Sequence, residues 1–240
     1  GGLKIEIIKP TEQVRTTFSG KVLYMTDPTA MRDPGKAFKE NPRKELTIDL
    51  IHDAVGPLYG HVGEEGDGNE FARSHTEQHM RVSGSLKLGD EDAISINGWG
   101  LRDHSWGPRY WQATPSYRWI TGNFGDDLGM VITCGANGEG RGLFHEGEEI
   151  IRVEKAVLST EYLENTLYHR NLSIDLDLAD GRKRHLDGKV MGYIPLRNRR
   201  AGANTHVGEG MTEYTLDDGR KGYGLSEYLT QPDDQGLEGE

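Results

Sequence analysis

Apolar and polar residues alternate along much of this chain, whereas helical periodicity is weak. In Leu172–Leu178, apolar side chains occupy every second position, as expected for a strand with one buried face. Asp180-Gly181 follows as a turn, because an Asp-Gly pair tolerates positive φ, and Val190–Ile194 can form the returning strand. The same pattern recurs around Asp218-Gly219. These segments predict antiparallel hairpins.

Further short alternating segments extend the prediction to the whole chain. The additional strands are Lys4–Ile8, Val14–Phe18, Lys44–Leu50, Glu77–Leu86, Ile94–Gly100, Tyr117–Asn123, Met130–Cys134, Gly142–His145 and Ile151–Leu158. About a dozen strands are typical of an all-β protein built as an antiparallel barrel or sandwich. Ser159–Leu167 is the segment for which we expect a short helical turn.

Charge and cysteine content exclude some classes of protein. The net charge of −11 and a pI near 5.3 argue against a nucleic-acid-binding protein, which would present a basic surface. No apolar run approaches the length of a membrane span, so we expect a soluble protein. The single cysteine, Cys134, cannot form an internal disulfide. The compartment, cytoplasmic or periplasmic, stays open.

One segment concentrates residues that can do chemistry. Leu101–Trp111 contains an aspartate, a histidine, two arginines, two tryptophans and a tyrosine. On a strand, Arg102, His104 and Trp106 would share one face, and Asp103 would point to the other. Titratable groups interleaved with large aromatic side chains favour a pocket for a largely apolar organic molecule. The alternative is a structural corner, in which tryptophans fill the core.

This segment resembles the carotenoid 1,2-hydratase family (hydroxyneurosporene synthases) and the related AttH-like proteins. The resemblance rests on Gly98–Gly107, with weaker support from Glu77–Gly84 and Gly222–Tyr228. It implies two lipocalin-like β domains packed side by side, with no metal or organic cofactor. Residues 1–66 would then be the closing strands of a partial first domain, 67–230 a complete second domain, and 231–240 a polar tail.

The resemblance also implies roles for individual residues. His104 and Trp106 are carried over directly, and Arg102 and Asp103 accompany them in the same motif. Hydration of an alkene needs an acid kept protonated by burial, for which Asp103 or Glu77 could serve. Trp106 could stabilise the carbocation, and His104 could hold the acid or activate water. For ligand binding we select Arg102, Trp99, Trp111 and Glu227.

Two functions from different classes follow. The first is a cofactor-free hydratase (a hydro-lyase), isomerase or cyclase that acts on a double bond of a terpenoid-like or polyketide-like substrate. The second is a noncatalytic lipocalin-like protein that binds a lipid, for example as a transport accessory. Both need an apolar cavity. A carboxylic acid buried against that cavity beside Trp106 would favour the enzyme, and carboxylates at the rim would favour the binding protein.

A metal enzyme with a cupin-like sandwich is a further alternative. His75, Glu77 and His79 alternate on one strand face and, with His104, could form a site of histidines and a carboxylate. Because polar residues continue along this face through Ser85, we expect a solvated strand face and no bound metal.

Overall fold

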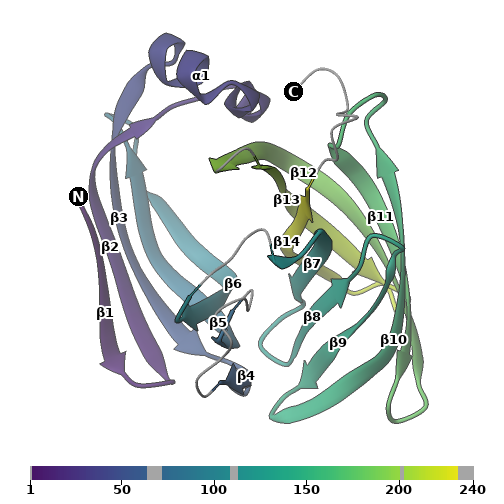
Figure 1. Ribbon diagram of the computed structural model, residues 1–240. Coiled ribbons are helices and arrows are strands. Elements are labelled where there is room, and N and C mark those ends of the chain that lie inside the picture. Colours follow the sequence, from purple (N-terminus) through teal and green to yellow (C-terminus); the bar gives the residue numbers. More distant parts are fainter. Residues whose placement is uncertain (1, 64–71, 109–112, 201–202, 232–240) are drawn as a thin grey trace.

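The computed structural model describes residues 2–63, 72–108, 113–200 and 203–231, and it confirms an all-β fold. An open antiparallel sheet of six strands lies beside a closed antiparallel barrel of eight strands (Figure 1). None of the helices in the described ranges has the length and apolarity that crossing a membrane requires.

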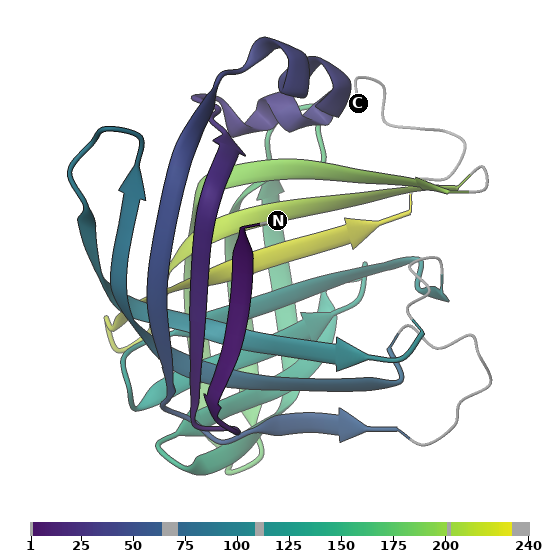
Figure 2. The ribbon, with the colours of Figure 1, turned by 90° about the vertical axis from the view of Figure 1, so that its left-hand side faces the viewer.

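The open sheet contains the first six strands. They are β1 (Leu3–Lys9), β2 (Gln13–Leu23), β3 (Arg43–Ala54), β4 (Tyr59–Val62), β5 (Ser74–Leu88) and β6 (Ile94–Trp106). A 3₁₀ turn, η1 (Pro28–Arg32), and a short helix, α1 (Pro34–Glu40), connect β2 to β3. β5 pairs with β3 and β4 along one edge and with β6 along the other, so that β1, the short β4 and β6 border the sheet (Figure 2).

The two faces of the open sheet have different surroundings. Opposed residues of an antiparallel pair point to the same face, so the register assigns each side chain to one side. The cavity face, as we call it, includes Ile7, Val14, His52, Met80 and Arg102. The barrel face includes Glu77, His79 and Asp103, and it contacts the barrel.

The remaining strands close into the barrel. They are β7 (Ser116–Asn123), β8 (Leu128–Cys134), β9 (Glu139–Glu146), β10 (Glu149–Tyr162), β11 (His169–Leu178), β12 (Lys183–Arg200), β13 (Ala203–Leu216) and β14 (Lys221–Thr230). Fully buried side chains such as Phe144, Ile174 and Tyr214 fill the interior. A pocket lined by Arg118, Tyr228 and their neighbours has a volume of about 10 Å³, which is room for about one water molecule.

Aromatic and charged contacts join the sheet to the barrel. The rings of His79 on β5 and His145 on β9 lie 4.7 Å apart between centroids. They pack over Gly129 of β8, where an added Cβ would lie 2.4 Å from His145 Nε2. Arg81 and Trp99 both bind Asp126 in the β7–β8 turn, at 2.6 Å each. Sheet and barrel therefore share a specific interface.

The sequence-based elements agree with this fold, with one correction. The predicted strands lie within observed ones, but the helical turn expected at Ser159–Leu167 is wrong, since Ser159 and its neighbours continue β10 and pair with β11. The domain boundary predicted between residues 66 and 67 falls outside the described residues, between β4 and β5, which both belong to the open sheet. The change from sheet to barrel falls between Trp106 and Ser116.

Candidate functional site

Pairing of β5 with β6 brings two of the sequence motifs together. Glu77 lies directly opposite Asp103, and Gln78 lies opposite Arg102. The register continues without a shift from Ser74 to Leu86, so the alternation of faces is regular along both strands. The residues selected from sequence therefore divide between the two faces of one hairpin.

Arg102, His104 and Trp106 form a row on the cavity face, as their spacing predicts. Arg102 Nη2 lies 3.3 Å from His104 Nδ1, and the His104 and Trp106 rings lie 5.0 Å apart. The Trp106 side chain is 42% exposed, which leaves one end of the row open to solvent. The row thus combines a cation, an imidazole and an indole along one strand.

A cavity of about 430 Å³ lies against this row. It is bordered by Ile5, Ile7, Val14, Thr16, His52, Met80, Leu101, Arg102, Asp103 and His104. Strands β1 and β2 supply an apolar wall, and β6 supplies the charged and polar end. Asp103 borders the cavity through its place in β6, while its side chain is directed to the barrel face.

Among the described residues, three polar atoms on the cavity face of the sheet are buried without a hydrogen-bond partner. They are Arg102 Nη1, His52 Nε2 and Gln78 Oε1. The amide nitrogen of Gln78 is used, because it donates to the carbonyl oxygens of Thr11 and Gly56 at 3.0 and 3.2 Å. Burial lowers the pKa of His52, so its ring is neutral near pH 7. Leaving such groups unpaired is costly, and a polar ligand group would satisfy them.

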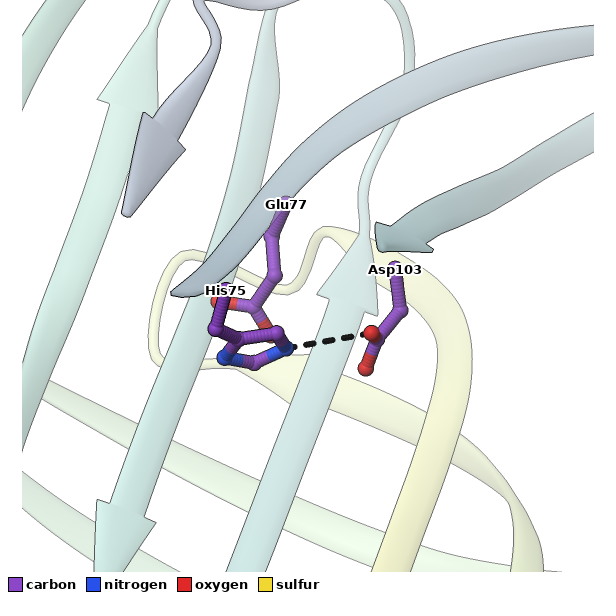
Figure 3. Close-up of side chains that lie close together, drawn as sticks. All are labelled: His75, Glu77 and Asp103. Atoms are coloured by element: carbon purple, nitrogen blue, oxygen red, sulfur yellow. Dashed lines mark ion pairs between the residues drawn. The ribbon is translucent and has the colours of Figure 1, made fainter. Parts of the chain in front are cut away.

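On the barrel face, His75, Glu77 and Asp103 converge (Figure 3). His75 Nε2 lies 3.1 Å from Asp103 Oδ1 and 4.0 Å from Glu77 Oε1. The indole of Trp119 on β7 donates to Glu77 Oε1 at 2.9 Å. Burial raises the pKa of Glu77, and the charge of Asp103 adds to this, whereas His75 and the Trp119 hydrogen bond oppose it. Glu77 is thus a shielded acid, but on the face opposite Trp106.

The expectation of a solvated face at His75, Glu77 and His79 is wrong. Glu77 is 7% exposed and His79 is fully buried, because the barrel covers this end of β5. The four-residue metal set is not assembled either. His79 packs against His145, and His104 lies on the cavity face.

Glu227 belongs to the junction between sheet and barrel. It lies opposite Trp119 in one strand pair and opposite Glu209 in the next. The Tyr117 hydroxyl donates to Glu227. Burial, together with the neighbouring Glu227 carboxylate, raises the pKa of Glu209 to about 7. Trp119 therefore connects Glu77 on β5 with the part of β14 that contains Glu227. Neither of these two carboxylates lines the cavity.

One of the two tryptophans selected for ligand binding lies away from the cavity, and the other is not among the described residues. The Trp99 indole is on the barrel face and donates to Asp126. Trp111 lies outside the described residues. Sequence reasoning also missed Trp119, His52 and Tyr59. His52 had a usable signal, since it continues the apolar alternation of Ile48 and Leu50 and so occupies an otherwise apolar face.

Comparison with protein families gives a match that covers residues 1–232. Comparison with curated proteins finds none. The matching family is described as "Domain of unknown function (DUF7064)". Because the match covers nearly the whole chain, this protein belongs to the DUF7064 family.

Proposed function

We propose that the protein binds an apolar organic molecule in the cavity of the open sheet, with a polar or anionic group of that molecule at Arg102. One observation supports this most directly. The cavity joins an apolar wall from β1 and β2 to the buried, unpaired Nη1 of Arg102. Small-molecule sites combine apolar walls with a few placed polar groups in this way.

The dimensions and exposure of the cavity suit a lipid-like or terpenoid-like ligand. Its volume of about 430 Å³ falls within the range of about 300–1,000 Å³ typical of small-molecule pockets. Ile5 and Ile7 are 64% and 66% exposed on its wall. A ligand that covers them would gain about 25 cal/mol for each Å² of apolar surface removed from water.

Arg102 favours a carboxylate as the polar group of the ligand. Arginine remains charged at any physiological pH and forms strong, paired hydrogen bonds with carboxylates. His104 contacts the same guanidinium, and His52 places a neutral ring nitrogen at the cavity border. The ligand class that fits best is therefore an acid with an apolar body, such as a fatty acid or a terpenoid acid.

Binding has more support than catalysis of hydration. Protonation of an alkene requires an acid that reaches the ligand, and the shielded acid, Glu77, points to the barrel face. Asp103 is paired with His75, and its side chain is 41% exposed. We also propose that the protein is related to the carotenoid 1,2-hydratases. An open sheet beside a closed barrel is compatible with that relationship. We propose a noncatalytic binding role within that wider group.

The test compares two ligands that differ only in the polar group. Displacement of a fluorescent fatty-acid probe is measured for hexadecanoic acid and for hexadecanol, with wild type and Arg102→Met. Loss of a charged hydrogen bond costs about 1.5–3 kcal/mol, so binding of the acid should weaken about 10- to 150-fold and binding of the alcohol far less.

Arg15→Met is the matched control, because Arg15 lies on the opposite face of the sheet and pairs with Asp49. It should leave both affinities unchanged. The proposal fails if neither ligand displaces the probe at about 100 μM, or if Arg102→Met weakens the acid and the alcohol equally.

A further inference from the structure

The barrel face of the β5–β6 hairpin holds three side chains of the kinds that bind metal ions. His75 and Glu77 are two residues apart on β5, and Asp103 is opposite Glu77 on β6. One ligand atom of each lies within 4.8 Å of the others, with His75 Nε2 and Asp103 Oδ1 at 3.1 Å (Figure 3). Ligand atoms at about 2.0–2.2 Å from a common ion lie about 3–4.4 Å apart, so these side chains would need to close only slightly around an ion.

The charges at this position favour a cation. Two carboxylates converge, and one of them, Glu77, is buried. Their contacts include an imidazole and the neutral indole N–H of Trp119, neither of which is a permanent positive charge. A buried carboxylate is stabilised by pairing or by a metal ion.

Tyr59 supplies an independent observation. It lies on β4 directly opposite Glu77, so its side chain shares the barrel face. The residue is 9% exposed, and its hydroxyl is buried without a hydrogen-bond partner. Burial and the nearby Glu77 and Asp103 charges raise the pKa of Tyr59. The unpaired hydroxyl therefore lies on the same face as the two carboxylates and within reach of their charge, and an ion or an ion-bound water there would satisfy it.

We propose that His75, Glu77 and Asp103 bind a divalent transition-metal ion, with the Tyr59 hydroxyl beside it. One imidazole and two carboxylates form a mixed nitrogen and oxygen donor set that suits Zn²⁺, Mn²⁺, Fe²⁺ or Co²⁺. All three ligands stand on paired strands, and Trp119 fixes Glu77 from the barrel side. The three ligand side chains point to the face opposite the ligand cavity, so metal binding does not require the proposed binding of an apolar acid, although Asp103 also borders that cavity through its place in β6.

The experiment uses the full chain without an affinity tag, stripped with a chelator and titrated separately with Zn²⁺, Mn²⁺ and Co²⁺. Calorimetry should give one site with a Kd of about 10 μM or tighter for at least one of these ions. Asp103→Asn and His75→Gln should each weaken binding at least 10-fold. Asp126→Asn is the matched control, because Asp126 is an acid at the same junction that pairs with Arg81 instead.

A second readout in wild type does not depend on the folding of the variants. Bound Co²⁺ is paramagnetic, so it should shift or broaden the ring resonances of His75 and leave those of His185, on the barrel, unchanged. Absence of stoichiometric binding for all three ions would overturn the proposal. Binding that leaves the His75 resonances unaffected, or that survives in both Asp103→Asn and His75→Gln, would overturn it as well.

Discussion

Acid should weaken this protein through His79, the buried histidine at the junction of sheet and barrel. The His79 ring is fully buried and faces His145, so protonation would place a charge in a desolvated site. Burial, with a smaller contribution from His145, lowers the pKa of His79 to about 3. Unfolding restores a pKa of about 6.5. The unfolded chain therefore binds the proton more readily, and stability falls as the pH drops from 6.5 towards 3.

The size of this effect follows from the two pKa values. At pH 5 the pKa of the histidine in the unfolded chain is about 1.5 units above the solution pH, and each pKa unit corresponds to about 1.4 kcal/mol. His79 alone should therefore remove about 2 kcal/mol of unfolding free energy between about pH 7.5 and 5. Urea unfolding of wild type and His79→Gln at both pH values measures this, because any general destabilisation of the variant cancels in its own pH difference.

The control for this prediction is His185, a histidine whose pKa is shifted in the opposite direction. His185 is on the surface of the barrel, where the Asp175 hydrogen bond raises its pKa. It contributes stability below pH 6.5 that is lost as the pH rises, so His185→Gln should not reduce the acid-induced loss. If His79→Gln loses as much stability on acidification as wild type does, the account of the junction is refuted.

Three further predictions concern the junction, the Glu77 carboxyl group and the buried cysteine of the barrel core. Gly129→Ala should destabilise the protein by about 1–3 kcal/mol in urea unfolding, because the new Cβ overlaps His145, whereas Gly192→Ala, with no atom within 4 Å, should have little effect. Trp119→Phe removes a donor to Glu77, so carboxyl-carbon NMR should show a still higher pKa for Glu77; an unchanged value would contradict the hydrogen bond. Reaction of Cys134 with a thiol reagent should be slow below about pH 9, since burial raises its pKa to about 11; fast labelling of the folded protein would contradict its burial.

The strands were predictable because one face of most of them is buried and the other is exposed. Leu172–Leu178 alternates in sequence and in burial, and its hairpin is observed as β11 and β12. Alternation also placed Arg102, His104 and Trp106 on one face. These predictions need only the two-residue period of a strand and the conformation of a turn.

What covers each face could not be predicted from the same pattern. The polar run from His75 to His79 has the composition of a solvated strand, yet the barrel covers one side and the β1–β2 turn reaches the other, where Thr11 binds Gln78. The convergence of His75 and Glu77 with Asp103 depends on the register of β5 with β6, which is set by contacts between strands. The contribution of Trp119 depends on how the barrel packs on the sheet.

The position of a bound ligand decides whether the cavity of the open sheet is the binding site. A fatty acid with a nitroxide spin label, added to isotope-labelled protein, broadens the NMR signals of amides close to it. We expect broadening at Val14, His52 and Met80 around the cavity of the open sheet, with sharp signals at Ile132 and Ile174 inside the barrel. Broadening centred on the barrel interior, or no broadening at a saturating concentration of the acid, would contradict it.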